Sequence, residues 1–232
     1  MTVSVLVPYR ADGGARDRAW AWIRRWWNAE HPGWQLVEGR CDDGPWRKAV
    51  AVDDALARAD GDVLVVADAD VFVAGAADAV AAVRAGSAGW AVPHHRVHRL
   101  SEPATAAVLA GEPWPRAARA GYARPPYKGV AGGGIAVLPR STYERVPIDA
   151  RFEAWGSEDL AWGAALDTVA GRHLRGSAPL VHLWHPPAPR LNAHVGSAAS
   201  HALLVRWQYA AKAGPAAVDG LVAEARAAVA AR

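Results

Sequence analysis

Short apolar runs alternate with longer amphipathic stretches along most of the chain. The apolar runs favour buried strands and cover residues 3–7, 34–37, 63–67, 89–93, 135–138 and 180–183. Stretches with the apolar spacing of a helix lie between them, at residues 17–28, 46–59, 76–85 and 159–170. Strands that alternate with helices pack as a sheet with helices on both faces. We therefore expect an α/β fold with a doubly wound, mostly parallel sheet.

Two regions depart from this alternation. The tail from Ser197 is rich in Ala and amphipathic, which predicts C-terminal helices. Residues 94–128 hold five prolines with little periodicity, which predicts a long loop, either irregular surface or a lid over a site. Basic side chains outnumber acidic ones in this loop: Arg96, Arg99, Arg116, Arg119, Arg124 and Lys128 against Glu102 and Glu112.

Composition narrows the class of protein. A chain of 232 residues with 52% apolar and 21% charged residues is expected to fold as one globular domain. No run has the length of a transmembrane helix, and the first residues lack a basic segment before their apolar stretch, so we expect neither a membrane span nor a signal peptide. The single Cys41 excludes an internal disulfide and fits the cytoplasm. The net charge of +3 favours anionic ligands such as a nucleotide sugar; it leaves nucleic acid possible without indicating it.

The acidic pair Asp68 and Asp70 follows the predicted strand at residues 63–67. Ligands of open α/β sheets bind at the carboxyl ends of strands, and alternate residues of an extended segment point to the same side. One carboxylate there can bind a divalent cation and the other a ribose or a water, and hard oxygen ligands suit Mn²⁺ or Mg²⁺. The bland alternative is a pair of acids in a solvated loop.

His182 and His185 follow the last predicted strand and precede two prolines. Imidazoles three residues apart can converge on one metal ion, although the same spacing also occurs in surface histidines. Together with the acidic pair they favour a mixed carboxylate and imidazole site, which suits Mn²⁺ better than Mg²⁺.

Glu158 and Asp159 open the predicted helix at residues 159–170, directly after Trp155, Gly156 and Ser157. Acids are stabilised at helix N-termini in any case, and this is the structural alternative. The aromatic face and small residues before them also suit a substrate. A carboxylate in that place can act as the base that deprotonates an acceptor hydroxyl.

Six short motifs in this order resemble the β-1,4-galactosyltransferase-like branch of GT-A glycosyltransferases, over residues 3 to 190. They are Pro8-Tyr9-Arg10, Trp46-Arg47-Lys48-Ala49, Asp68-Ala69-Asp70, Gly133-Gly134-Ile135, Trp155-Gly156-Ser157-Glu158-Asp159 and His182-Leu183-Trp184-His185.

The resemblance implies a GT-A fold. Together with the sequence pattern it divides the single domain into a nucleotide-binding half (1–93), the basic loop (94–128), an acceptor and metal half (129–190) and C-terminal helices (191–232). It implies that Asp70, His182 and His185 bind Mn²⁺, that Asp159 is the base and that Glu158 contacts a sugar. The donor would be bound by Pro8, Tyr9, Arg10, Lys48, Asp68, Gly133, Gly134 and Trp155, with Pro8 and Arg10 at the uracil and ribose and Lys48 at the diphosphate.

Three departures from the family pattern leave the donor sugar open. Arg47 replaces an Asn, Ser157 replaces a Gly, and Ala131-Gly132 stand where the galactose enzymes carry a bulky aromatic residue. The expected reaction is metal-dependent, inverting transfer of a hexose or N-acetylhexosamine from a UDP-sugar to a hydroxyl of a glycan, protein or small molecule. The alternatives are a nucleotidyltransferase acting on a sugar phosphate and a noncatalytic module that binds glycan or nucleic acid.

Overall fold

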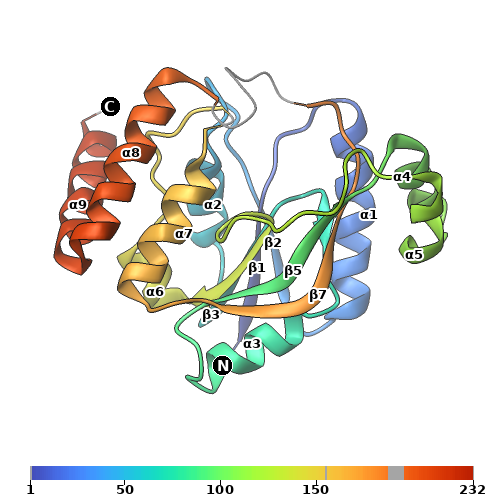
Figure 1. Cartoon of the computed structure of the whole chain (residues 1–232), viewed down its shortest axis with the longest axis horizontal. Coiled ribbons are helices and arrows are strands. Elements are labelled where there is room, and N and C mark those ends of the chain that lie inside the picture. The colour runs from blue at the N-terminus through green and yellow to red at the C-terminus, as the bar shows by residue number, and fades with distance from the viewer. Residues whose placement is uncertain (1, 155, 188–195, 232) are drawn as a thin grey trace.

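A single mixed sheet forms the centre of the molecule in the computed structural model, which describes residues 2–154, 156–187 and 196–231 (Figure 1). Within those residues the strand order is β2-β1-β3-β6-β5-β7-β4. Five of the seven strands run in one direction, and only β4 and β6 oppose them, so the mostly parallel sheet is confirmed. The strands are β1 (Val3–Pro8), β2 (Gln35–Gly39), β3 (Val63–Ala67), β4 (Val71–Phe72), β5 (Ala91–Arg99), β6 (Ile135–Pro139) and β7 (Leu174–His182).

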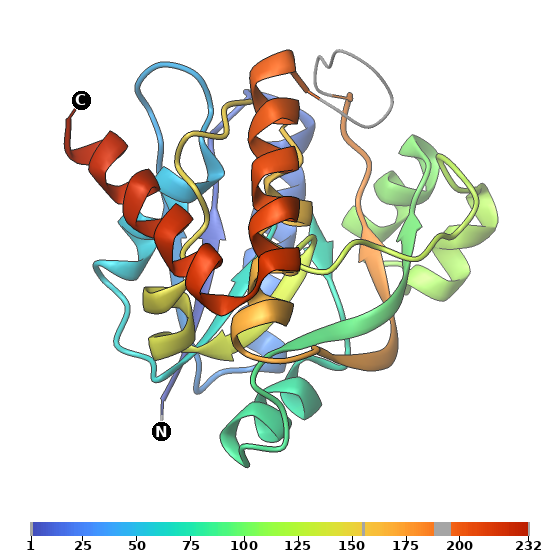
Figure 2. The same cartoon turned by 60° about the vertical axis from the view of Figure 1, so that its left-hand side comes forward.

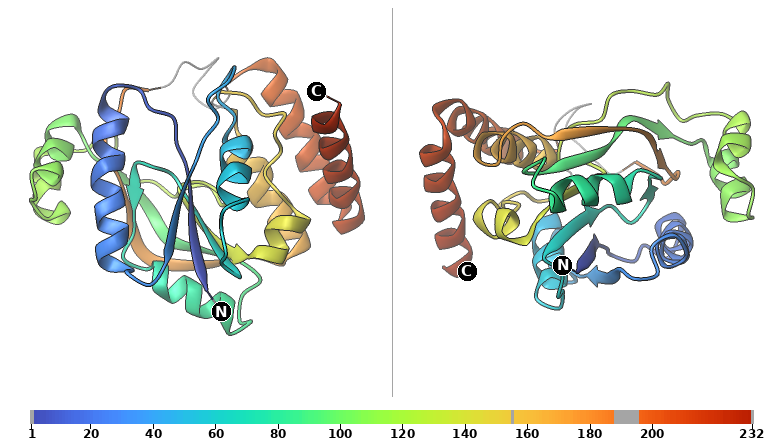
Figure 3. Two further views of the ribbon diagram at one scale, coloured as in Figure 1. Left: turned by 180° about the vertical axis from the view of Figure 1, so that it is seen from behind. Right: turned by 90° about the horizontal axis from the view of Figure 1, so that it is seen from below.

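Helices cover both faces of this sheet. Alternate residues of a strand point to opposite faces, so Val63 and Val65 of β3 enter one apolar core while Leu64 and Val66 enter the other. Figure 3 (left) shows α1 and α2 on opposite sides of β1 and β2. The helices are α1 (Ala15–Glu30), α2 (Lys48–Leu56), α3 (Ala76–Arg84), α4 (Glu102–Leu109), α5 (Trp114–Ala117), α6 (Arg140–Arg145), α7 (Glu158–Val169), α8 (Ala198–Ala213) and α9 (Pro215–Ala230), with a 3₁₀ turn, η1 (Ala118–Ala120).

The predicted C-terminal helices are confirmed as α8 and α9. They lie side by side at one end of the molecule, opposite α4 and α5 (Figures 1 and 2). Leu203, Leu204 and Trp207 of α8 are buried in the same core as α2 and α7. In the part of the chain that the structure describes, we find no helix whose length and apolar character would let it cross a bilayer.

The prediction of a continuous loop at residues 94–128 was wrong. β5 continues to Arg99, and α4, α5 and η1 follow it. The sequence obscured the strand because its exposed residues are His and Arg and because β-bulges interrupt its register between Val92 and Arg96. Ser101 caps α4 through a hydrogen bond from the Ala104 amide at 3.2 Å.

The direction of the strands brings the predicted motifs to one edge of the sheet. The carboxyl ends of β3, β5 and β7 meet there, and β6 starts there because it runs antiparallel to β3, with Ala67 opposite Ile135. The Asp68 amide donates to the Gly134 carbonyl oxygen at 2.9 Å. The acidic pair, the glycines before β6 and the histidines after β7 therefore share this edge.

Candidate active site

Asp70, His182 and His185 form a compact group at this edge. A turn follows β3 and leads into β4, where Val71 pairs with His182 and the Leu183 amide donates to the Asp70 carbonyl oxygen at 2.8 Å. The Asp70 carboxylate lies 3.1 Å from His185 Nε2 and 3.7 Å from His182 Nε2. One ligand atom from each of the three residues lies within 4.8 Å of the other two. The structure thus assembles the predicted metal ligands.

The hydrogen bonds of the two imidazoles decide which nitrogen faces Asp70. Nδ1 of His182 lies 2.7 Å from the Leu183 carbonyl oxygen, and Nδ1 of His185 lies 2.7 Å from that of Pro186. A carbonyl only accepts, so Nδ1 carries the proton and the Nε2 lone pair faces the carboxylate. Two electron-rich atoms 3.1 Å apart, as in His185 and Asp70, need a proton or a cation between them.

Charge states at this group also fit a metal. Burial lowers the pKa of His182 to about 4, which leaves the imidazole neutral and able to ligate near neutral pH. Burial alone would raise the pKa of Asp70, but the charge that the histidine rings carry when protonated outweighs it and holds that pKa below its usual value. One carboxylate and two imidazoles are a donor set that Mn²⁺ accepts.

Lys48 joins three elements beside this group. Its ammonium lies 2.8 Å from Asp68 Oδ1, at the end of β3, and 2.8 Å from Asp159 Oδ1, at the start of α7. The Lys48 side chain is only 7% exposed. Burial would lower the pKa of Lys48, but the Asp159 and Asp68 carboxylates raise it well above its ordinary value, so the ammonium stays charged.

The two acids of the acidic pair therefore have different partners. Asp68 pairs with Lys48, whereas Asp70 faces the histidines. The expectation that both acids face one ligand assumed an extended segment. Instead, β3 ends at Ala67, and the next residues, Ala69 and Asp70, form a turn. The diphosphate contact predicted for Lys48 stays a prediction, and its observed partners are carboxylates.

Asp159 contacts Lys48 through one oxygen and lies against Gly133 with the other. A Cβ atom added at Gly133 would lie only 3.1 Å from Asp159 Oδ2, so the backbone of this glycine packs closely against the carboxylate. Burial raises the pKa of Asp159, and Lys48 offsets only part of the effect. Burial, and next the Asp159 charge, raise the pKa of Glu158 to about 7. Glu158 Oε2 accepts from the Gly156 amide at 3.2 Å.

The backbone before α7 is strained. Ser157 caps the helix with φ of 66°, and Ala154 has φ of 57°, a region that favours glycine. The Gly that the resemblance expects at position 157 would adopt this conformation freely. Strain of this kind concentrates at functional sites. Trp155, predicted to bind the donor, lies outside the described residues.

The predicted nucleotide contacts lie at the last residue of β1 and in the segment after it. Pro8 pairs with Gly39 of β2, and the Tyr9 hydroxyl donates to Asp17 at 2.5 Å. Arg10 donates to the carbonyl oxygens of Cys41 and Gly44, and its guanidinium lies 5.6 Å from the centre of the Trp46 ring. This segment thus lies between α1 and the segment that joins β2 to α2.

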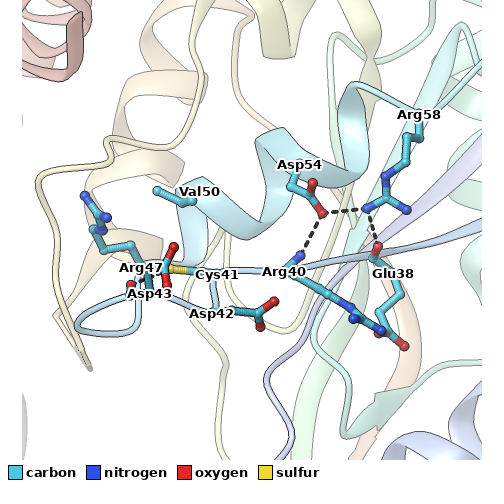
Figure 4. A pocket seen from close by; sticks show the side chains of 9 residues that line it. All are labelled: Glu38, Arg40, Cys41, Asp42, Asp43, Arg47, Val50, Asp54 and Arg58. Atoms are coloured by element: carbon cyan, nitrogen blue, oxygen red, sulfur yellow. Dashed lines mark hydrogen bonds and ion pairs between the residues drawn. The ribbon is translucent and has the colours of Figure 1, made fainter. Parts of the chain in front are cut away.

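A groove of about 670 Å³ opens beside β2 and α2, and none of the side chains predicted for catalysis, donor binding or metal binding lines it (Figure 4). Two ion pairs lie in this groove: Arg58 with Asp54 at 2.5 Å, and Arg40 with Glu38 at 3.3 Å. The predicted chemistry lies at the metal group instead.

Sequence reasoning missed the place of Arg99. Arg99 is opposite His182 in the register of β5 and β7. Burial lowers the pKa of His182, and the positive charge of Arg99 lowers it further. The apolar residues Val97 and Leu100 were the signal that the strand continues past Pro93.

No family model and no curated protein matches the sequence. Solved structures do match the fold. A structure of GalNAc-T7 with UDP, GalNAc and Mn²⁺ aligns with 90% of this chain at a TM-score of 0.54 and 15% sequence identity. The chain has a GT-A fold. It spans about half of that protein, 48% of its length.

Two further structures are more distant. The Drosophila β-1,4-galactosyltransferase 7 mutant with manganese, UDP-Gal and xylobiose aligns with 75% of this chain and 64% of its own, at 14% identity and a TM-score of 0.44. Glucosyl-3-phosphoglycerate synthase from Mycobacterium tuberculosis, with Mn²⁺, UDP-glucose and phosphoglyceric acid, aligns with 90% of this chain and 78% of its own, at 13% identity and a TM-score of 0.43.

Proposed function

We propose that this protein is a metal-dependent glycosyltransferase that moves a hexose or N-acetylhexosamine from a UDP-sugar to an acceptor hydroxyl with inversion. The observation that carries the proposal is the group of Asp70, His182 and His185 at the carboxyl edge of a GT-A sheet, with their ligand atoms within 4.8 Å of each other. The enzyme would be located in the cytoplasm.

Asp70, His182 and His185 would hold the metal ion. Their donor set of one carboxylate oxygen and two imidazole nitrogens favours Mn²⁺, with Mg²⁺ as the alternative. The bound ion would neutralise the charge that develops on the departing diphosphate. The GalNAc-T7 structure that shares this fold was crystallised with UDP and Mn²⁺, in agreement with this ligand and donor.

Asp159 would act as the general base. Its Oδ2 beside Gly133 would accept the proton of the acceptor hydroxyl while the acceptor oxygen bonds to the anomeric carbon. The bond between that carbon and the diphosphate oxygen breaks in the same step, and its electron pair leaves with UDP. Glu158 lies next to the base and would contact a sugar hydroxyl.

The donor nucleotide would bind at the end of β1 and along the segment after it. Pro8, Tyr9 and Arg10 would contact the uracil and ribose, and Gly133 and Gly134 would let the donor sugar approach the backbone. Asp68 would contact the ribose or a water, and Trp155 would contact the donor.

A product assay tests the reaction class. We would incubate the protein with UDP-hexoses and UDP-N-acetylhexosamines, one at a time, with Mn²⁺ and without acceptor. We expect slow release of UDP and free sugar from one donor, because water replaces the acceptor. Release of UMP and sugar phosphate or of pyrophosphate would indicate nucleotidyl chemistry instead. If the protein neither turns over any donor nor binds UDP, the result would favour a noncatalytic binding module.

A further inference from the structure

Two arginines contact Tyr127, which lies between η1 and β6, and a third arginine contacts the residue before it. Arg99 Nε donates to the Tyr127 hydroxyl oxygen at 3.1 Å. The guanidinium of Arg124 lies 3.6 Å from the centre of the Tyr127 ring, and Arg96 donates to the Pro126 carbonyl oxygen at 3.4 Å. We call Arg96, Arg99 and Arg124 the arginine cluster.

Backbone hydrogen bonds hold the cluster together. The Val97 amide donates to the Tyr127 carbonyl oxygen at 2.8 Å, and the Ala123 amide donates to the Arg99 carbonyl oxygen at 2.9 Å. The segment that carries Arg124 and Tyr127 is therefore paired with β5, which carries Arg96 and Arg99. Paired backbone therefore fixes the positions from which the three arginine side chains extend.

No carboxylate of the described residues lies within 4.0 Å of these three guanidinium groups. Elsewhere on the molecule arginines such as Arg145, Arg151 and Arg206 are paired with acids. Neighbouring cations repel each other, so an anion that contacts several of them gains affinity. Guanidinium groups form paired hydrogen bonds with phosphate oxygens in particular.

The cluster lies beside the proposed reaction centre. Arg99 is opposite His182, and the Leu100 amide donates to the His182 carbonyl oxygen at 2.9 Å. In the other direction, the chain runs from Tyr127 directly to Gly133, which adjoins Asp159 Oδ2. The arginine cluster is therefore next to the metal group on one side, and on the other a short segment joins it to the glycine that packs against Asp159.

We propose that the arginine cluster binds the phosphate group of a small phosphorylated acceptor and so places the acceptor hydroxyl near Asp159. This inference rests on the transferase function proposed above and adds the chemical class of its acceptor. A small acceptor fits better than nucleic acid, because the arginines contact only the two neighbouring residues Pro126 and Tyr127 and the net charge is only +3.

Binding calorimetry on the full chain tests the proposal. The probe is sn-glycerol 3-phosphate, with glycerol as its neutral counterpart, in the presence of saturating UDP and Mg²⁺. Two variants remove one positive charge each: Arg124→Gln within the cluster and Arg119→Gln at an exposed position of η1. UDP binding with Mg²⁺ is measured on the same samples.

We expect glycerol 3-phosphate, but not glycerol, to bind the wild type. Arg124→Gln should weaken this binding about tenfold, the loss of a charge-assisted hydrogen bond, while Arg119→Gln leaves it unchanged. UDP binding should be equal in all three proteins. Phosphate binding that depends on Arg124, in a protein that does not bind UDP, would support the anion site and refute the transferase function.

Four results would overturn the proposal. The first is that glycerol 3-phosphate does not bind. The second is that both variants weaken its binding equally, which indicates general attraction between charges. Arg124→Gln would weaken UDP as much as glycerol 3-phosphate, which assigns the cluster to the donor. A short DNA or RNA oligonucleotide would bind through Arg124 far more tightly than the phosphate probe, which indicates a nucleic-acid partner.

Discussion

At the scale of single residues, the two adjacent acids at the start of α7 differ in their surroundings. Asp159 is held by Lys48 through one oxygen and leaves the other beside Gly133. Glu158 accepts a hydrogen bond from Gly156, and its buried carboxyl has a pKa raised to about 7. The Lys48 ammonium stabilises the charged form of Asp159 directly, whereas Glu158 accepts from a backbone amide, and this favours Asp159 as the base.

We expect Asp159→Asn to lower turnover by about 10²- to 10⁴-fold, since the amide cannot accept the proton, and to leave UDP binding nearly unchanged. Glu158→Gln is the matched control and should act mainly on substrate affinity. Steady-state kinetics of both variants, together with UDP calorimetry, measure these effects. If Glu158→Gln removes turnover and Asp159→Asn retains it, the base has been assigned to the wrong residue.

At the scale of elements, Lys48 connects α2, the end of β3 and the start of α7. The sequence predicted that each of these elements exists, because each has clear periodicity. It did not predict this connection, since a contact between residues 111 positions apart depends on how the elements pack. The same reason explains why the extension of β5 was missed: its polar exposed face and its bulges hide the alternation.

Lys48→Met should destabilise the fold by up to about 3 kcal/mol near neutral pH, because it leaves two half-buried carboxylates without their cation. The loss should shrink as the pH falls and those carboxylates become protonated. Without the ammonium the pKa of Asp159 should rise further, so the acid limb of the pH–rate profile moves to higher pH. Urea unfolding at several pH values and a pH–rate profile measure both effects.

The controls are Lys48→Arg, which keeps the charge, and Lys212→Met at an exposed position of α8. Neither should shift the acid limb. A loss of stability in Lys48→Met that is the same at every pH would show that Lys48 contributes packing and not charge.

At the scale of the whole molecule, the sheet places motifs from distant parts of the sequence at one edge. The order of apolar runs was sufficient to predict the α/β class and the C-terminal helices, because burial dictates those patterns. The direction of β6 and the short β4 were not predictable, since strand pairing is a long-range property.

The sheet also buries His94 completely, and neither of its ring nitrogens has a partner among the described residues.

His94 should make the fold sensitive to acid. Burial, followed by the charges of Arg175 and His95, lowers the pKa of His94 to about 4, below the 6.5 of a free histidine. Because the unfolded chain binds a proton that the folded chain does not, the free energy of unfolding should fall as the pH drops from 6.5 toward 4, by about 1.4 kcal/mol per pH unit. Above pH 6.5 this contribution is fully present.

Urea unfolding in EDTA across this range measures the slope. His94→Leu should flatten it by the amount that one histidine contributes, and His201→Leu, at an exposed position of α8, should not. Glu158 contributes in the opposite direction, because its raised pKa stabilises the fold at low pH. The wild type and the variant share this contribution, so it cancels when their two slopes are subtracted. An unchanged slope in His94→Leu would contradict the assignment.

We propose that Asp70, His182 and His185 hold a metal that binds UDP. Calorimetry of UDP binding with and without Mn²⁺ tests it most directly, on the wild type, Asp70→Ala and the exposed control Asp78→Ala. We predict tight binding that requires Mn²⁺ in the wild type and in Asp78→Ala, and loss of the Mn²⁺ requirement together with most of the affinity in Asp70→Ala. UDP binding by the wild type that is the same with and without Mn²⁺, or an Asp70→Ala protein that keeps the full Mn²⁺ dependence, would contradict it.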